Sequence, residues 1–189
     1  TDVGSSKEKS HDVIKKTLKK GISWTSSHPI AGSEVSGPEH GNKDLFLNKW
    51  CILIKEKDTN RKHLSVLSKF WKKIGSRVSI MNSKKHDVIF SMTSHLPHLI
   101  AYNLVKTATD FEKQQRYELI KFSAGGLRDF SRIAASNEIM WRDIFIDLDL
   151  QAHSEIQRAK ITITDENEYN IERFIKLAKR WKKFRITVK

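Results

Sequence analysis

The chain has 189 residues, of which 38% are hydrophobic and 30% are charged, a composition that is typical of a globular protein and excludes a largely disordered one. Its formal net charge is +13 at pH 7, and its single cysteine, Cys51, excludes an intrachain disulfide. No apolar run approaches the roughly 20 residues that a membrane-spanning helix needs, and residues 1–20 contain no signal-type apolar segment. We therefore expect a cytoplasmic protein that has no membrane partner.

The positive charge raises the question of a nucleic-acid partner, because clustered Lys and Arg residues bind phosphates by releasing their counterions. The lysines occur instead in pairs expected on the solvent-facing sides of helices, without a recognisable nucleic-acid-binding module. These pairs are Lys15-Lys16, Lys19-Lys20, Lys72-Lys73, Lys84-Lys85 and Lys182-Lys183. We therefore expect no nucleic-acid partner, and a positive field that attracts small anions. The alternative, a basic nucleic-acid binder, predicts an affinity for DNA or RNA that falls steeply with salt.

The first half of the chain alternates strand and helix patterns, as in an α/β layer. Residues 1–5 are interpreted as the end of a strand that enters a helix, with Ser5 and Glu8 at the spacing of a capping box and Gly21 as the terminator. The elements predicted after this helix are strands at residues 22–27, 50–54 and 77–81 and a helix at residues 58–74 that stops at Gly75.

From about residue 83 the pattern changes to long helices without a convincing strand. Residues 86–106 predict a buried helix with a kink near Pro97, since proline removes a backbone hydrogen bond. A further helix is predicted at residues 167–183. A buried helix in so small a segment indicates that a second subunit covers it, so we expect a homodimer. The chain thus divides into an α/β part, residues 1–83, and an all-helical part, residues 84–189.

The eight glycines are informative because of a turn that they do not form. None lies in a G-x-G-x-x-G turn, which brings a dinucleotide pyrophosphate onto a helix N-terminus. If the protein is a nucleotide-dependent enzyme, its phosphate-binding part is therefore expected outside this chain.

One histidine lies in a tight turn of small residues, which reads His-Pro-Ile-Ala-Gly-Ser-Glu-Val-Ser-Gly over residues 28–37. His28 follows a predicted strand, and ligands of α/β sheets usually bind at the carboxyl ends of strands. An imidazole titrates near pH 6.5 and is mostly neutral at pH 7, so His28 can accept a hydroxyl proton. The alternative from the residues alone is a turn histidine that bonds to the backbone.

Two more histidines, His95 and His98, lie one helical turn apart and could in principle share a metal ion. A zinc site needs a third protein ligand, for which His86 is the nearest candidate. The apolar neighbours of the pair and Pro97 suit a packed, kinked helix better. We therefore expect no metal, and hydrogen bonds from these histidines to a buried polar ligand or to the core.

Arg128 and Arg132 follow a Gly-Gly pair and lie four residues apart. On a helix that begins near Leu127 they would share a face close to its positive end. A carboxylate would bind there, because a guanidinium group offers two parallel donors and the helix dipole adds attraction. The alternative is that these arginines form structural ion pairs with Asp129 or Asp143.

Several runs, in this order, resemble the prephenate dehydrogenase family, including its arogenate-using and cyclohexadienyl members. The runs are Asp2-Val3-Gly4-Ser5-x-Lys7, residues 28–37, His86-Asp87, Ser94-His95-Leu96-Pro97-His98, Gly125-Gly126-x-Arg128-Asp129-Phe130-Ser131-Arg132-Ile133-Ala134 and Met140-Trp141-Arg142-Asp143. The resemblance implies the C-terminal remainder of a Rossmann-like nucleotide-binding domain followed by a helical dimerisation domain. It implies an NAD- or NADP-dependent oxidoreductase of tyrosine biosynthesis that oxidatively decarboxylates prephenate or arogenate, a small anionic substrate.

The resemblance also implies catalytic and cofactor-binding roles. His28 would accept the proton of the 4-hydroxyl group as a hydride leaves ring carbon 4. Ser5 would lie beside His28 near the nicotinamide, and Val3 would be a further cofactor contact.

Substrate-binding residues and an ionic set at the site entrance are implied in the same way. Arg132 would hold the ring carboxylate, and His98 would face the side chain of the substrate. Trp141 matches a residue that reaches in from the neighbouring subunit. The implied substrate contacts are Arg132, His98, Gly126 and Trp141, and the implied ionic set is Glu34, Arg128 and Asp129.

The family pattern has strands and a Gly-rich turn before the position of Thr1. We therefore expect an N-terminally truncated fragment with lost or impaired activity, which does not bind NAD⁺ or NADP⁺ tightly on its own. The alternative is a non-catalytic remnant that acts as a dimerisation module.

Overall fold

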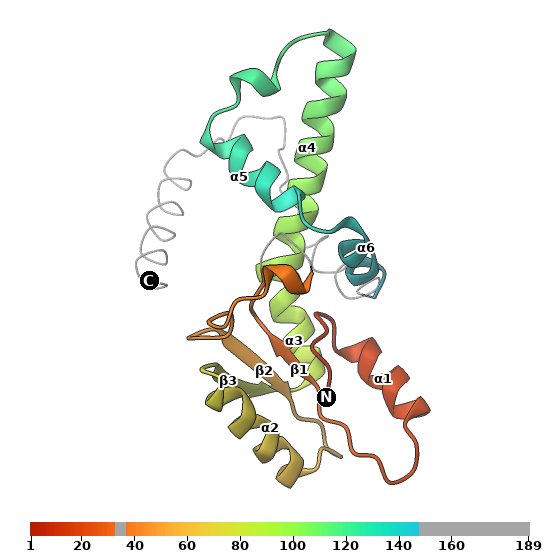
Figure 1. Cartoon of the computed structure of the whole chain (residues 1–189). Helices are drawn as coiled ribbons and strands as arrows, with labels where there is room; N and C mark the ends of the chain where they lie inside the picture. The colour runs from red at the N-terminus through yellow and green to blue at the C-terminus, as the bar shows by residue number, and fades with distance from the viewer. Residues whose placement is uncertain (33–36, 148–189) are drawn as a thin grey trace, which may run out of the picture. The chain divides into compact units, whose positions relative to one another are not determined.

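The computed structural model describes residues 1–32 and 37–147 (Figure 1). All of these residues belong to one compact unit. The helix predicted at residues 167–183 lies outside the described residues, as does Glu34 of the expected ionic set.

A three-stranded sheet in the order β1-β2-β3 forms the first half of the described chain. Its strands are β1 (Ser27–Pro29), β2 (Trp50–Ile54) and β3 (Arg77–Met81). β1 pairs antiparallel with β2, and β2 pairs parallel with β3. The predicted strands at residues 50–54 and 77–81 are confirmed.

The strand predicted at residues 22–27 is wrong in extent, because strand pairing begins only at Ser27. Upstream, the backbone N–H of Ile22 donates to the carbonyl of Lys19 in a turn, and the Ile22 side chain is 56% exposed. The apolar residues of this segment therefore do not cover the sheet, and periodicity alone does not show this.

Helix α2 (Arg61–Lys73) connects β2 to β3 and packs on the sheet. The main core cluster consists of Cys51, Leu53, Leu64 and Trp71. α2 starts three residues later than predicted because the side chain of Asn60 accepts the N–H groups at its start, including that of Lys62 at 2.9 Å. Gly75 follows the helix with φ of +93°, and a Cβ atom there would lie 2.9 Å from Leu47, so the predicted terminator is confirmed.

Helix α1 (Glu8–Thr17) does not begin with the predicted capping box. Its N-cap residue is Lys7, which makes no side-chain capping bond. The carboxylate of Asp87, 80 positions along the chain, accepts the backbone N–H groups of Lys7 and Glu8 instead. A tertiary contact therefore supplies the cap that a local Ser-x-x-Glu pattern suggested.

The second half of the described chain is helical, as predicted. Its elements are α3 (Ser83–Phe90), η2 (Ser91–His95), α4 (Leu96–Gln115), η3 (Ile120–Phe122), α5 (Gly125–Ala134) and α6 (Glu138–Asp147), and a short turn η1 (Pro38–His40) precedes them. Figure 1 shows α3, η2 and α4 as one long path that runs from beside the sheet to α5 and α6. η2 is a turn of π-helix, and Pro97 follows it in the first turn of α4, close to the predicted kink.

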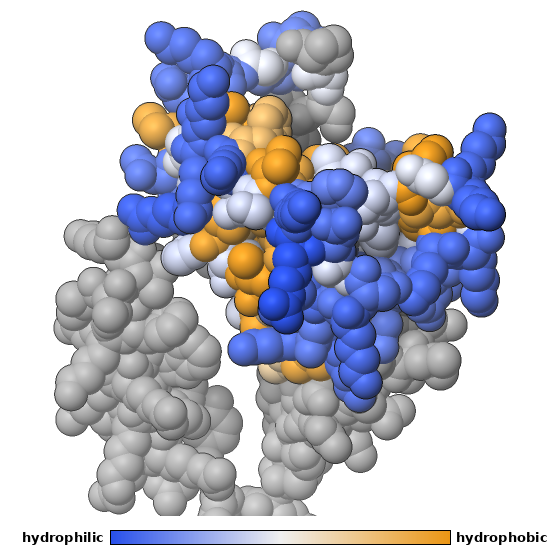
Figure 2. Space-filling model, turned by 90° about the horizontal axis from the view of Figure 1, so that it is seen from below, coloured by the Kyte–Doolittle hydropathy of each residue, from blue (hydrophilic) through white to orange (hydrophobic). Residues whose placement is uncertain are grey.

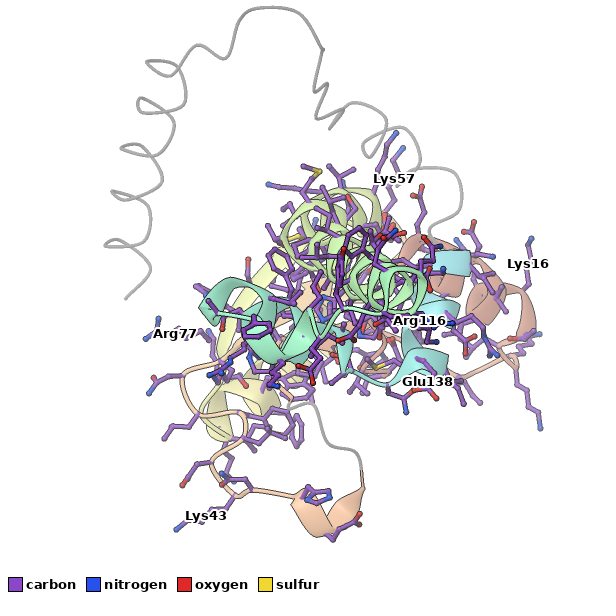
Figure 3. All side chains as sticks on the ribbon, turned by 90° about the horizontal axis from the view of Figure 1, so that it is seen from above. Lys16, Lys43, Lys57, Arg77, Arg116 and Glu138 are labelled. Carbon is purple, nitrogen blue, oxygen red and sulfur yellow. The ribbon has the colours of Figure 1, made fainter. Side chains whose placement is uncertain are left out.

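One face of the described part of the chain is mainly polar. The face in Figure 2 is mostly hydrophilic, with small apolar patches between charged side chains. Lys16, Lys57 and Arg77 point outward from different sides of the fold (Figure 3), and the described lysine pairs are exposed as predicted. Across residues 1–32 and 37–147, none of the helices combines the length and the apolar character that crossing a membrane would require.

Candidate active site

A pocket of about 480 Å³ lies where the sheet meets the helices that follow it. Its walls come from β1 and the residues after it, the residue before β2, η2, and helices α4, α5 and α6. Four of the predicted site residues line it together: His28, His98, Arg132 and Trp141. The tertiary structure thus assembles residues that lie up to 113 positions apart in the sequence.

His28 lies within β1, opposite Ile52, and does not follow a strand as predicted. Because β1 runs antiparallel to β2, the rule about carboxyl ends of parallel strands does not explain its position. Its side chain contacts α3. The Nδ1 atom lies 2.8 Å from Nε2 of His86, and the ring centroid lies 4.9 Å from that of Phe90.

Burial lowers the pKa of His28 to about 3, because desolvation disfavours the charged imidazolium, and the electrostatic interactions with His86 and Lys7 lower it further. Lys7 is itself fully buried, and its ammonium group donates to the Ser27 carbonyl and the Asp2 carboxylate. His28 is therefore neutral at pH 7, with one donor and one acceptor nitrogen.

The depressed histidine pKa values predict an acid-sensitive fold. Desolvation also lowers the pKa of His95, to about 4. Between about pH 4 and 6.5 the unfolded chain binds protons at both positions and the folded chain does not, so the free energy of unfolding rises with pH. We expect up to about 1.4 kcal/mol per pH unit for each histidine.

Urea denaturation from pH 4 to pH 7 measures this slope. His95→Gln and His28→Asn should each make it shallower. An unchanged slope in both variants would contradict the buried, neutral state of these side chains.

His86 and Asp87 form a buried pair behind His28. The sequence had offered His86 only as a possible third metal ligand and had given Asp87 no role. His86 is fully buried, and its Nδ1 lies 2.7 Å from a carboxylate oxygen of Asp87. Both ring nitrogens of His86 thus have partners within the protein, which removes it as the third metal ligand for His95 and His98. Only the adjacency of His86 and Asp87 could have indicated the pair from sequence, because their contacts with β1 and α1 are long-range.

His98 and Trp141 form a stacked pair at the pocket wall. Their ring centroids lie 3.6 Å apart at an angle of 20°. The Nδ1–H of His98 donates to the backbone carbonyl of Ser94 at 2.8 Å, which leaves Nε2 as an acceptor. The sequence predicted that Trp141 reaches in from a neighbouring subunit. In this chain Trp141 is buried against its own His98.

Two cations line the pocket, Arg132 and Lys49. The prediction that Arg132 lies near the positive end of its helix is wrong, because α5 begins at Gly125 and Arg132 lies in its last turn. The helix dipole therefore does not assist an anion at Arg132. Sequence reasoning missed Lys49, since a lysine before a strand carries no distinctive signal. Asp143, a proposed alternative partner of the arginines, pairs with Arg142 at 2.7 Å.

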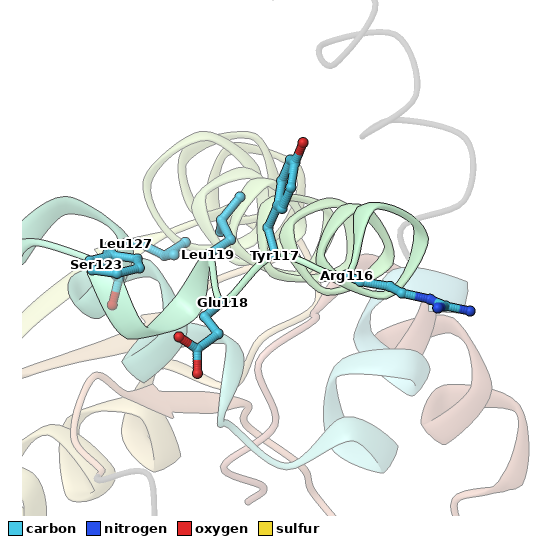
Figure 4. A pocket seen from close by; sticks show the side chains of 7 residues that line it. Arg116, Tyr117, Glu118, Leu119, Ser123 and Leu127 are labelled. Carbon is cyan, nitrogen blue, oxygen red and sulfur yellow. The ribbon is translucent and has the colours of Figure 1, made fainter.

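The other predicted site residues do not line this pocket. Ser5, Val3, Gly126, Arg128 and Asp129 are described but lie elsewhere. Their roles, like that of Glu34, stay predictions. A larger hollow of about 750 Å³ lies at the α4–α5 connection, where Arg116, Tyr117 and Leu127 contribute to its wall (Figure 4). It contains none of the predicted site residues and no histidine.

Comparisons with known proteins give two family matches. Residues 1–80 match the nucleotide-binding domain of prephenate dehydrogenase, and residues 82–177 match the dimerization domain of prephenate dehydrogenase. The cyclohexadienyl dehydrogenase of Zymomonas mobilis is 38% identical over 121 residues, which cover 64% of this chain and 41% of that protein. The prephenate dehydrogenase of Bacillus subtilis is 34% identical over 187 residues, which cover 95% of this chain and 50% of that protein.

Among solved structures, the chain is similar to prephenate dehydrogenase from A. aeolicus in complex with hydroxyphenyl propionate and NAD⁺. The TM-score is 0.84 and the identity 32%, over 100% of this chain and 66% of that one. The chain spans half or less of the length of the two curated relatives described above. The α/β part followed by helices agrees with the predicted fold class, in which an α/β nucleotide-binding domain is joined to a helical dimerisation domain. On this evidence, the chain belongs to the prephenate dehydrogenase family.

Proposed function

We propose that the chain carries the substrate-binding part of a prephenate or arogenate dehydrogenase, an oxidoreductase of tyrosine biosynthesis. The reaction is the oxidative decarboxylation of a cyclohexadienyl substrate, with NAD⁺ or NADP⁺ as the hydride acceptor. We further propose a homodimer, with the domain boundary near residue 83 and the helical part at the subunit interface.

The pocket supports this proposal most directly, because it combines the groups that such a substrate requires. Arg132 and Lys49 supply positive charge for carboxylates, and His28 is a buried neutral imidazole. The stacked pair of His98 and Trp141 offers an aromatic wall and an acceptor nitrogen for a planar ring and its side chain.

The chemistry that we assign to the chain's own residues is binding and proton transfer. Arg132 orients the ring carboxylate. His28 accepts the hydrogen bond and then the proton of the 4-hydroxyl group, while the carbon–carbon bond to the carboxylate breaks and carbon dioxide leaves. A neutral acceptor suits this step, because a protonated imidazole could not take the proton.

The cofactor supplies the hydride acceptor when it is bound. The 189 residues contain no G-x-G-x-x-G turn, Val3 is 61% exposed and Ser5 lies outside the pocket. These residues do not make a recognisable dinucleotide site, so the roles of Val3 and Ser5 beside the nicotinamide are proposals that rest on the family relation alone.

Isothermal titration of the full chain with hydroxyphenyl propionate and with prephenate tests the proposal without a cofactor. We expect saturable binding with one site per chain, which weakens as salt is raised because the pocket attracts anions. Failure to bind either compound, together with a dimer in analytical ultracentrifugation, would overturn the proposal in favour of a non-catalytic dimerisation module.

A further inference from the structure

We propose that His86 and Asp87 are positioning residues that hold His28 in the tautomer whose Nε2 atom is an unprotonated acceptor. The inference rests on the proposed function only for the use made of that nitrogen. The arrangement itself is a row of three side chains, Asp87–His86–His28, that begins at the N-terminus of α1 and ends at the pocket.

The row starts at a carboxylate whose position and charge are stabilised. Asp87 is 5% exposed, and its oxygens accept the N–H of Glu8 at 2.8 Å and that of Lys7 at 3.0 Å. Free N–H groups at a helix start stabilise negative charge. An ionised carboxylate only accepts hydrogen bonds, so the group that faces it from α3 must donate.

The tautomer of His86 then determines which nitrogen of His28 carries the hydrogen. Its Nδ1 lies 2.7 Å from Oδ1 of Asp87, so Nδ1 carries the hydrogen. In a neutral imidazole the other nitrogen, Nε2, is then an acceptor. That atom lies 2.8 Å from Nδ1 of His28, which must therefore be the donor of this bond.

His28 is left with its hydrogen on Nδ1 and a lone pair on Nε2. Burial keeps the ring neutral, and the nearby Lys7 ammonium opposes a second positive charge. The ring is also confined by Phe90, whose centroid lies 4.9 Å away. A hydroxyl group in the pocket thus meets an acceptor. The opposite tautomer would present an N–H donor to that hydroxyl and could not take its proton.

The row has the logic of a catalytic triad, in which a buried carboxylate selects the tautomer of a histidine. It differs because a second histidine stands between the carboxylate and the base. Removing the negative charge of Asp87 should therefore move the hydrogen from Nδ1 to Nε2 in both His86 and His28. In Asp87→Asn, the amide oxygen would take the place of Oδ2 and keep the N–H of Glu8, and the amide NH₂ would take the place of Oδ1 and face His86.

Nitrogen NMR of the full chain, labelled with ¹⁵N-histidine and without substrate or cofactor, reads the tautomers directly. We expect His28 and His86 to carry hydrogen on Nδ1 in the natural sequence. In Asp87→Asn both should carry it on Nε2. Asp12→Asn, an exposed carboxylate on α1, is the matched control and should change neither ring. Hydrogen on Nε2 of His28 in the natural sequence would overturn the proposal, whatever the variants do.

Asp87→Asn could also destabilise the start of α1. Two variants of His86 therefore test the same inference without changing Asp87. In His86→Gln, the amide oxygen can accept from Nδ1–H of His28, so the His28 tautomer should be retained. In His86→Leu no acceptor is left, and His28 should lose its preference for hydrogen on Nδ1. If both variants fold, as circular dichroism would show, and both retain the tautomer equally, the role of His86 is refuted.

These measurements separate the inference from the proposed function. A chain that binds no prephenate could still show the predicted tautomers, and a chain that binds it could show the wrong ones. Where prephenate binds, Asp87→Asn should lower the affinity at least threefold while Asp12→Asn leaves it unchanged, because the His28 acceptor is lost. Unchanged affinity in a folded Asp87→Asn chain with reversed tautomers would refute the use of Nε2 by the substrate.

Discussion

Replacing Arg132 by alanine is expected to weaken the binding of hydroxyphenyl propionate or prephenate by about 30- to 100-fold. Arg132 lines the pocket, where its guanidinium group can donate two parallel hydrogen bonds to a carboxylate. Losing charge-assisted bonds of this kind costs about 2.0–2.7 kcal/mol, which corresponds to the expected change in affinity. Isothermal titration at low and at high salt measures it.

Two further variants test whether the loss of affinity is due to the guanidinium group of Arg132 and not to a general loss of positive charge. Arg132→Lys keeps the charge but not the fork geometry, so its affinity should lie between those of the natural chain and Arg132→Ala. Arg77→Ala removes an arginine from β3 that points outward (Figure 3) and does not line the pocket, and it should have little effect. Equal losses in Arg132→Ala and Arg77→Ala would mean that general charge, and not a carboxylate site, drives binding.

Replacing Trp141 by alanine is expected to lower the free energy of unfolding by about 3–5 kcal/mol, the cost typical of truncating a buried large aromatic side chain. Trp141 is 6% exposed, stacks on His98 and packs with Ile144 in the second core cluster. The side chains around Trp141 come from η2, α4 and α6, and their truncated partner would leave a cavity between these elements. Urea denaturation at pH 7 measures the loss.

Ile139→Ala is the matched control, because it truncates an apolar side chain of the same helix that is 56% exposed. It should change stability by no more than about 0.5 kcal/mol. Ligand affinity of Trp141→Ala, measured where the variant is still folded, should also fall because His98 loses its stacking partner. A destabilisation below about 1 kcal/mol would show that Trp141 is not buried in the chain in solution.

The local sequence pattern was sufficient to predict a helix or strand where that element buries one face and ends at a distinctive residue. β2 and β3 were predicted at their observed bounds, since β-branched and other apolar residues form short runs there. Helix α2 was predicted because Leu64 and Trp71 recur at helical spacing and Gly75 stops it. The change from an α/β part to helices was also evident from sequence.

The local sequence pattern gave wrong predictions where a residue distant in the sequence supplies the hydrogen-bond partner. The capping box at Ser5 and Glu8 did not form, because the carboxylate of Asp87 occupies the start of α1. The dipole argument for Arg132 failed because helix bounds are the least certain feature of a sequence prediction, and α5 starts two residues before the position assumed.

The sequence by itself determined four of the side chains that line the pocket, because the runs around His28, His98, Arg132 and Trp141 carry the resemblance to the prephenate dehydrogenase family. Only the tertiary structure decided that these four side chains line one pocket, and that His86 and Asp87 stand behind His28. The physical reason is that propensity and periodicity describe neighbours along the chain. The position, protonation and tautomer of a buried histidine such as His28 depend on burial and on hydrogen bonds to residues that are distant in sequence.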